Sequence, residues 1–293
     1  MKSSPTSAER ACDALLRRYG IDLTDENKTA LAAYRARTRR ARWWGVIGAF
    51  FIGGLDLLGS TEDAGSLGIA RLFTGYLVGS AAAELFSPQR RAAGAIHAAS
   101  LTTREPGLLL PVWARILPWL VLVPCLASPL LMLGAHPTGI TRIHDETGSA
   151  MGAAHWIPSP VLVSIAILAA AGLVFWRLIL RRLARRRLPA DRPGAARLDL
   201  LTRALSARAV SGTAAALGMS LLAGLASLTV EPLNSMTCTK VAGCHYVYAW
   251  HAQDNLIQSL GFLTILAAIS LFFYSRRPRI DESKLHSAIE SSR

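Results

Sequence analysis

Residues 158–187 read PSPVLVSIAILAAAGLVFWRLILRRLARRR. From Pro158 to Leu180 the only charged residue is Arg177, and such a segment is long enough to cross a hydrocarbon layer about 30 Å thick as a helix. The arginines within 181–187 are typical of the inner end of a membrane span, where they contact lipid head groups. Nucleic-acid binding is the other use of such a cluster, but its place directly after a span favours the membrane.

The composition of the whole chain agrees with this segment. Of the 293 residues, 52% are hydrophobic and 17% are charged, and the mean hydropathy is +0.33. Soluble domains carry about 25% charged residues. The apolar content and the presence of only four cysteines exclude a disordered chain and a small disulfide-rich domain. A polytopic membrane protein remains.

Six segments are long and apolar enough to be membrane spans: 43–60, 67–86, 110–134, 158–180, 209–230 and 255–275. We therefore expect an all-α fold, a transmembrane bundle of six helices, with a basic helical tail at 1–42 and a second tail at 276–293. The second segment is the least apolar, because Arg71 and Glu84 interrupt it. The alternative is a four-span protein whose first two segments form a re-entrant or surface hairpin. The polar stretch before the first segment is far longer than the leader of a cleaved signal peptide, so this segment is expected to be retained.

The distribution of positive charge predicts the orientation of the chain. Of the 32 Lys and Arg residues, 29 lie in four stretches: 1–42, 90–115, 177–208 and 276–293. The loops on the opposite side hold only Arg142 and Lys240. Because Lys and Arg mark the cytoplasmic side of a membrane, both termini are expected to be cytoplasmic. The net charge of +13 then predicts contact with the anionic inner leaflet, and no nucleic-acid partner.

The amino-terminal tail has the pattern of two helices. Ser7 is placed to cap the first helix and Gly20 to end it. Thr24 is placed to cap a second helix with Asp25 and Glu26 in its first turn, and this helix is expected to continue into the first span. A helix–turn–helix DNA reader has a similar outline, but no recognition face distinguishes it here from a basic collar at the membrane.

A short basic amphipathic helix is predicted before the fifth span, after a break at Pro189 to Gly194. Three leucines repeat at helical spacing with three arginines beside them: Leu198, Leu201, Leu205, Arg197, Arg203 and Arg208. We expect this helix to lie on the inner leaflet. A helix that docks onto a partner would have the same pattern.

Two charged residues lie within the first two spans. Asp56 and Arg71 are equidistant from the middle of the intervening turn, so they lie at the same depth of an antiparallel hairpin. We expect them to form a structural ion pair, because an unpaired charge in the bilayer is costly. A proton or ion relay is the alternative. Glu84 lies at the inner end of the second span, close to Arg90 and Arg91, and is expected to be structural.

Small residues recur at four-residue spacing in three of the spans. These ladders are Gly45, Ala49 and Gly53; Gly75, Gly79 and Ala83; and Gly212, Ala216, Ser220 and Gly224. Such ladders let helix backbones approach closely in lipid, which predicts a tightly packed bundle. They also allow contact with a second copy or with another membrane protein. Four prolines in the third span predict a kinked helix.

Five of the seven histidines lie in two outer loops: His136, His144, His155, His245 and His251. Asp145 and Glu146 lie in the first of these loops, and Cys238 and Cys244 lie in the second. Since this side faces an oxidising space, a Cys238–Cys244 disulfide is expected. A zinc or copper site is the alternative, although no recognised metal-binding spacing is present. The aromatic stretch 245–251 could be a short strand, an interfacial belt or a lid over a ligand.

Five short stretches carry a resemblance to known proteins: GYL at 75–77, AEL at 83–85, AASL at 98–101, LPVWAR at 110–115 and ALSARAV at 204–210. Together with the strong bias to arginine, they resemble a loosely defined family of uncharacterised multi-span membrane proteins from high-GC bacteria. The resemblance covers residues 40 to 215. It implies a multi-span membrane location and no particular activity.

The sequence therefore predicts an integral protein of a bacterial plasma membrane without catalysis of its own. No phosphate-binding loop or nucleophile elbow is present, and no cofactor is expected. Its role would be structural, regulatory or accessory to a transport or export system. A small-molecule or ion transporter is the main alternative, and it would need a polar site in mid-membrane. An outer-face metal or redox protein is the third hypothesis, and it would need the histidines and cysteines of the loops to converge.

Overall fold

The computed structural model of the chain describes residues 7–57, 64–85, 110–133, 139–144, 150–155, 159–185, 193–230, 235–239, 243–247 and 251–276. For the strands, the description covers the backbone alone, and the same holds for these residues of the helices: 7–9, 11, 52–57, 64–67, 85, 130–133, 159–160, 185, 193–196, 227–230 and 251–258.

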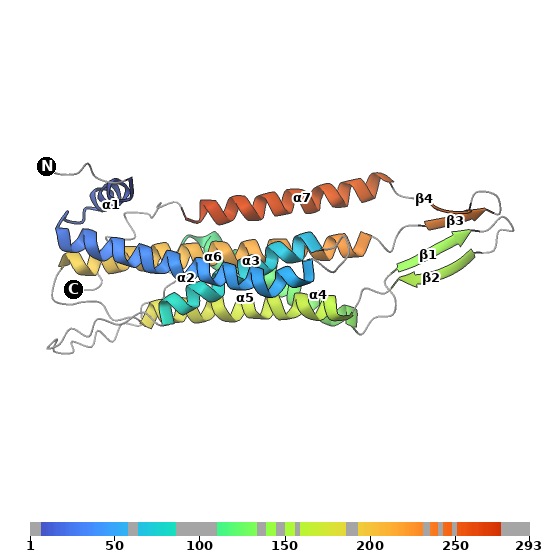
Figure 1. Cartoon of the computed structure of the whole chain (residues 1–293), viewed down its shortest axis with the longest axis horizontal. Coiled ribbons are helices and arrows are strands. Elements are labelled where there is room, and N and C mark those ends of the chain that lie inside the picture. The colour runs from blue at the N-terminus through green and yellow to red at the C-terminus, as the bar shows by residue number, and fades with distance from the viewer. Residues whose placement is uncertain are drawn as a thin grey trace.

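The described part contains seven helices and four short strands (Figure 1). The helices are α1 (Ser7–Arg18), α2 (Asp25–Leu57), α3 (Ala64–Leu85), α4 (Val112–Leu133), α5 (Ser159–Arg185), α6 (Pro193–Val230) and α7 (His251–Tyr274). The strands are β1 (Gly139–His144), β2 (Ala150–His155), β3 (Ser235–Thr239) and β4 (Gly243–Val247). The helices agree with the predicted helical bundle, and the strands add a small sheet to it.

Among the described residues, three helices are long and apolar enough to cross a membrane, by length and composition: α4, α5 and α6. A shorter apolar stretch, Ser259–Tyr274, lies in α7. Each of the six predicted spans coincides with one long helix, although the bounds differ. α5 continues through Arg185, beyond the predicted end at Leu180, and α6 begins at Pro193.

Local signals in the amino-terminal tail act as the sequence predicts. Gly20 has a φ of 61° and ends α1, with Ile21 N–H donating to the carbonyl of Leu16 (3.0 Å) and Gly20 N–H to that of Arg17 (3.2 Å). This is the Schellman pattern, in which a glycine takes the left-handed conformation. At the start of α2, Thr24 Oγ1 accepts a hydrogen bond from Asn27 N–H (3.3 Å), which confirms the helix cap. α2 then runs without a break for 33 residues.

The helices α2 and α3 pack antiparallel with their backbones almost in contact. A Cβ atom added at Gly45 would lie 2.8 Å from the nitrogen of Gly79, and closer still to the carbonyl oxygen of Gly75. A Cβ added at Gly79 would lie 2.9 Å from the Cα of Arg42. Only glycine fits these positions without a shift of the backbone, and close backbone approach is the usual way for helices to associate in lipid.

α6 is the central helix of the bundle. It contacts α2, α3, α4, α5 and α7, and it is buried over most of its length. Its core residues are mainly small, so the neighbouring helices approach it closely: a Cβ at Gly212 would overlap Ser275, directly after α7, and one at Gly218 would overlap Val121 of α4. Trp176 of α5 is the largest fully buried side chain, and its Nε1–H donates to Ser211 Oγ (3.0 Å).

A second hydrophobic core lies at the end of the molecule that holds α1 (Figure 1). Its buried members come from α1, the turn after it, the start of α2 and the start of α6: Cys12, Leu15, Leu16, Tyr19, Ile21, Leu31, Leu198, Leu200 and Leu201. We call this unit the inner cap. Arg197 Nη1–H adds a hydrogen bond to the carbonyl of Gly20 (3.2 Å), and Lys28 pairs with Asp13 (3.3 Å).

The inner cap corrects the prediction of a separate helix on the inner leaflet. Residues 193–208 are the first turns of α6, continuous with the fifth span. Their leucine face packs on α1 and α2, because the tail supplies a complementary apolar face that periodicity within one segment does not reveal. The alternative prediction is a helix that docks onto a partner, and here the partner is the amino-terminal part of the same chain.

The four strands form one sheet in the order β2-β1-β3-β4 at the opposite end of the molecule (Figure 1). β1–β2 and β3–β4 are antiparallel hairpins, and β1 and β3 join them in parallel. The hairpin β1–β2 lies between α4 and α5 in the chain, and β3–β4 lies between α6 and α7. Of the three possibilities for 245–251, a strand is found for His245 to Val247.

The packing of α2 on α3 predicts a difference between two neighbouring glycines. Gly45→Ala should lower the free energy of unfolding by about 1–3 kcal/mol, because the added methyl group meets the backbone of α3. Gly48→Ala is the matched control, since a Cβ at Gly48 meets no atom within 4 Å, and it should leave stability unchanged or raise it by up to about 1 kcal/mol. Denaturant unfolding in detergent measures both. Equal effects of the two substitutions would contradict the close approach of the helices.

Candidate functional site

Glu84 on α3 is the centre of a buried group of polar side chains. Only 5% of this residue is exposed. Its Oε1 accepts a hydrogen bond from the hydroxyl of Tyr34 on α2 (3.0 Å) and another from Ser206 Oγ on α6 (3.1 Å). Three helices thus meet at one carboxylate. Such hydrogen bonds offset part of the cost of burying its charge.

Arg42 on α2 supplies the positive charge of the same group. Its Nε–H donates to Ser80 Oγ on α3 (3.2 Å), and its Nη2–H donates to Ser206 Oγ (3.3 Å). Ser206 therefore accepts from the guanidinium and donates to Glu84, so that one hydroxyl bridges the cation and the anion. We call these five residues, Tyr34, Arg42, Ser80, Glu84 and Ser206, the inner polar cluster.

Tyr76 extends the cluster to α7. The guanidinium carbon of Arg42 lies 5.3 Å from the centre of the Tyr76 ring, and that of Arg276 lies 4.4 Å from it. Arg276 Nε–H also donates to the Tyr76 hydroxyl (3.2 Å). Cation–π contacts of this kind are stronger where the groups are desolvated. Arg276, the second residue after α7, is therefore held to α3 beside the inner polar cluster.

The electrostatics of the cluster keep Tyr34 as a neutral donor. Burial raises the pKa of the Tyr34 hydroxyl above its ordinary value, and the negative charge of Glu84 raises it further. The hydroxyl also lies 3.4 Å from the carbonyl oxygen of Thr202. The proton therefore stays on the tyrosine, which donates a hydrogen bond to the Glu84 carboxylate.

Two arginines of α6 are buried as well, which corrects their expected place on the surface. Arg203 pairs with Asp199 and donates from Nη1 to the carbonyl of Leu183 on α5 (3.2 Å). The guanidinium carbon of Arg208 lies 5.9 Å from the ring centre of Trp113 on α4 and 5.0 Å from that of Tyr274 on α7. Both arginines join α6 to its neighbours, because α6 already packs against α4, α5 and α7 before the predicted start of the span at residue 209.

The structure places the other charged residues of the predicted spans as follows. Arg71 is half-buried on α3, while the side chain of Asp56 lies outside the described residues, so the ion pair between them stays a prediction. Arg90 and Arg91, the neighbours expected for Glu84, also lie outside the described residues. Glu84 itself lies at the end of the second predicted span, as expected, and is buried against α2 and α6.

The glycines chosen for helix packing lie at helix contacts or in the core. Gly75 and Gly79 face α2, and Gly212 faces Ser275 beyond the end of α7. Gly224 is buried near the end of α6.

The backbone register brings some of the outer residues together. Cys238 on β3 is the direct partner of Cys244 on β4. His144, Thr237 and His245 form one row across β1, β3 and β4.

The remaining outer histidines are placed elsewhere. His155 pairs with Gly139, an odd number of residues from His144, and therefore belongs to the other face of the sheet. His251 begins α7, and His136 lies outside the described residues.

A metal site is not completed within the described part of the chain. No group of three or more His, Cys, Asp or Glu residues converges there. Zinc sites need three or four ligands, and the row across the sheet supplies two histidines. The outer metal site stays a prediction that depends on loop residues outside the described ranges.

The inner polar cluster is not among the predicted features, but the spacing of polar residues in the sequence contains a signal for it. Polar residues recur every four positions at Tyr34, Thr38 and Arg42 on α2, at Tyr76, Ser80 and Glu84 on α3, and at Thr202 and Ser206 on α6. Residues four apart share a helix face. Three such stripes predict one polar contact between helices, but which stripes meet depends on how the helices are arranged.

Removal of the bridging hydroxyl tests the cluster. Ser206→Ala leaves Glu84 and Arg42 each without one hydrogen-bond partner, and it should lower the free energy of unfolding by about 1–3 kcal/mol. Thr264→Ala is the control, because the Thr264 hydroxyl is exposed and bonds only to the carbonyl of Leu260 on its own helix. The control should change stability by less than about 0.5 kcal/mol. If both variants unfold at the same denaturant concentration, Ser206 does not bridge the two charges.

Comparison of the chain with models of protein families, with curated proteins and with solved structures finds no match.

Proposed function

We propose that this chain is an integral protein of a bacterial plasma membrane, with six spans and both termini in the cytoplasm. In this proposal it acts as a non-enzymatic scaffold, a structural or regulatory component that can serve a transport or export system. The observation that carries the proposal is the continuity of α6. Its first turns belong to the inner cap, its middle is the centre of the bundle, and its end leads into the sheet.

The exposed side chains support the six spans. Large apolar residues lie on the surfaces of the outer helices, among them Phe50 and Phe51 on α2, Ile167 on α5 and Phe262 on α7. A soluble protein would bury such residues, whereas lipid is a suitable environment for them. α2 and α3 approach each other through Gly45, Gly75 and Gly79, a close backbone contact typical of membrane helices.

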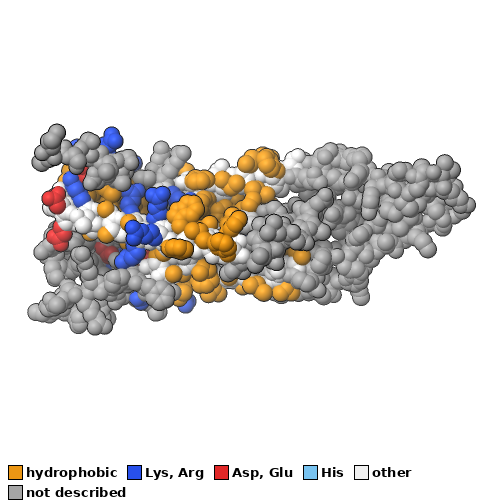
Figure 2. Space-filling view, viewed as in Figure 1, with side chains coloured by type: hydrophobic (Ala, Val, Ile, Leu, Met, Phe, Trp, Pro, Cys, Tyr) orange, Lys and Arg blue, Asp and Glu red, His pale blue; other side chains and the backbone are white. Residues whose placement is uncertain are grey.

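The separation of charge along the molecule supports the orientation. Figure 2 shows Lys and Arg side chains gathered toward the end that holds α1 and the start of α2, with a band of hydrophobic side chains beyond them. The sheet lies at the opposite end (Figure 1). With positive residues on the cytoplasmic side, the inner cap is cytoplasmic and the sheet is external.

The hydrogen bonds of the hydroxyl groups within the bundle favour the scaffold function over the transporter function. Thr213 and Ser220 donate to the carbonyls of Ala209 and Ala216 on their own helix, and Ser211 accepts from Trp176. These groups are satisfied within the protein, so they do not line a polar path in the described part of the bundle. The inner polar cluster lies toward the inner cap and holds α2, α3 and α6 together.

The Cys238–Cys244 disulfide is part of the same proposal. Directly paired residues of antiparallel strands have Cα atoms about 4.5–5.5 Å apart. Disulfides need a Cα separation of about 4.4–6.8 Å, so the register of β3 and β4 suits the bond. An external, oxidising location would allow it to form.

The orientation and the disulfide can be tested in one labelling experiment. Cys12 and Cys125 are first replaced by Ser, and intact cells are treated with a membrane-impermeant maleimide before and after reduction. Label should enter Cys238 and Cys244 only after reduction. In a second variant without native cysteines, Thr29→Cys, an exposed position on α2, should be labelled only after the cells are permeabilised.

The two halves of this experiment can fail separately. Labelling of Thr29→Cys in intact cells would reverse the orientation. Labelling of Cys238 or Cys244 without reduction would exclude the disulfide. If zinc or copper then blocked that labelling, the outer metal site would replace the disulfide as the better explanation of this sheet.

The scaffold proposal predicts that the inner cap and the bundle unfold together. Leu16→Ala in the inner cap should cost about 2–5 kcal/mol, because Leu16 is fully buried. The reporter is the thiol of Cys125, which is buried in the bundle and lies 3.4 Å from the carbonyl oxygen of Gly218. In a background without the other cysteines, Leu16→Ala should lower the denaturant concentration at which Cys125 reacts.

Leu23→Ala, at an exposed position between α1 and α2, is the control and should leave this midpoint unchanged. If Leu16→Ala loosens α1 while Cys125 stays protected, the cap is an independent module and the scaffold proposal fails. Ion or proton flux through the purified protein in liposomes would favour the transporter instead.

A further inference from the structure

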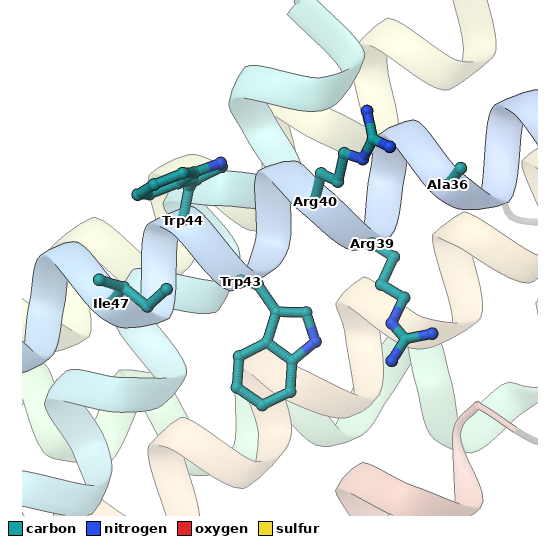
Figure 3. Close-up of a pocket in the computed structure, with 6 residues that line it drawn as sticks. All are labelled: Ala36, Arg39, Arg40, Trp43, Trp44 and Ile47. Atoms are coloured by element: carbon teal, nitrogen blue, oxygen red, sulfur yellow. The ribbon is translucent and has the colours of Figure 1, made fainter.

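A pocket lies on the exposed side of α2, where the tail meets the first predicted span. Its volume is about 370 Å³, and Figure 3 shows the residues that line it, all from α2: Ala36, Arg39, Arg40, Trp43, Trp44 and Ile47. The pocket is distinct from the inner polar cluster, to which α2 contributes Tyr34 and Arg42. The pocket therefore combines two charged guanidinium groups with two largely apolar indole rings. A ligand or solvent in contact with it must suit both kinds of group.

The side chains form two pairs at a spacing of four residues. Arg39 and Trp43 extend to one side of α2, and Arg40 and Trp44 extend to the other side (Figure 3). Each pair places a guanidinium one helical turn from an indole ring. Ala36 is small, which leaves room beside the guanidinium groups, and Ile47 continues the apolar side of the pocket.

The guanidinium groups of this pocket are available to a ligand. Among the described residues, neither Arg39 nor Arg40 has a hydrogen-bond or ion-pair partner. Neighbouring arginines of α2 are engaged within the protein: Arg35 contacts Cys12 Sγ, and Arg42 bonds to Ser80 and Ser206. The helix therefore carries two kinds of arginine, one directed to its own bundle and one directed outward.

The tryptophans fix the depth of the pocket in a membrane. Trp43 is 57% exposed and Trp44 is 71% exposed. Exposed apolar residues follow them on α2, first Ile47 and then Phe50 and Phe51. Tryptophan prefers the boundary between the hydrocarbon and the head groups. Arg39 and Arg40, one turn before the tryptophans, then lie at the level of the lipid phosphates.

We propose that this pocket binds the phosphate head group of an anionic phospholipid of the inner leaflet. Arg39 and Arg40 lie on either side of the pocket and turn toward the phosphate when the lipid binds, forming charge-assisted hydrogen bonds with it, and Trp43 and Trp44 flank the glycerol region and the start of the acyl chains. Ile47 contacts an acyl chain. This site deepens the proposed function and depends on it for its location, since α2 must enter the membrane from the cytoplasm at Trp43.

The shape of the surface favours a lipid over a soluble anion. A free phosphate would be satisfied by the two guanidinium groups and would gain nothing from exposed indole rings or from Ile47. A lipid uses the charged and the apolar residues of the pocket together, in the order in which they occur along α2. Charge complementarity with anionic lipid adds attraction near the membrane surface.

Titration of the purified full chain with lipid tests the proposal. The protein is held in a neutral detergent, and native mass spectrometry measures the binding of phosphatidylglycerol and of phosphatidylcholine with the same acyl chains. The wild-type protein should bind phosphatidylglycerol about tenfold more tightly. The double variant Arg39→Gln/Arg40→Gln should lose this preference and bind both lipids equally.

A matched control removes the same charge elsewhere. Arg17→Gln/Arg18→Gln changes two adjacent exposed arginines of α1 and should keep the preference. Trp43→Leu/Trp44→Leu should weaken the binding of both lipids and leave the preference in place. Each variant is first checked for an unchanged unfolding midpoint.

Three results would overturn the site. These are equal binding of the two lipids by the wild type, an equal loss in the α1 control, and displacement of phosphatidylglycerol by inorganic phosphate at a similar concentration. The last result would assign the arginines to a free anion. Because this titration needs no membrane orientation, its failure is distinguishable from failure of the labelling test with Thr29→Cys, which concerns the topology.

Discussion

The contact of the α2 and α3 backbones at Gly45, Gly75 and Gly79 determines where the polar groups of the inner polar cluster lie. Because no side chain separates the two helices there, their register is set within a narrow range. That register brings the polar stripe of α2 against the polar stripe of α3, and α6 adds Ser206 from a third side. A shift by one turn of either helix would leave Glu84 buried without its donors, which is costly in an apolar environment.

α6 extends this arrangement over the whole length of the molecule. The helix has 38 residues and is therefore about 57 Å long, while a hydrocarbon core is about 30 Å thick. The part of α6 that exceeds this thickness includes its first turns, which complete the inner cap. Arg203 and Arg208 join this part of the helix to α4, α5 and α7. The inner cap and the bundle thus share one continuous helix.

The sequence predicts the helices well, because apolar length, caps and small-residue spacing are local properties that one segment carries by itself. Thr24 and Gly20 mark helix ends for this reason. The sequence does not predict which segment packs against each helix face. The leucine stripe of 198–205 is as consistent with lipid as with α1, and Glu84 looks like an interfacial residue until α2 and α6 enclose it. Such features depend on the arrangement of segments far apart in the chain.

The composition of the inner cap has a consequence for synthesis of the chain. Cys12, Leu16 and Leu31 are made first, but Leu198 and Leu201, which complete their core, follow only after the intervening chain has been translated. At the usual rates of translation this interval is on the order of ten seconds or more. During that time the apolar face of α1 has no partner from α6. In this interval the face is open to other contacts, such as a chaperone or the surface of a membrane.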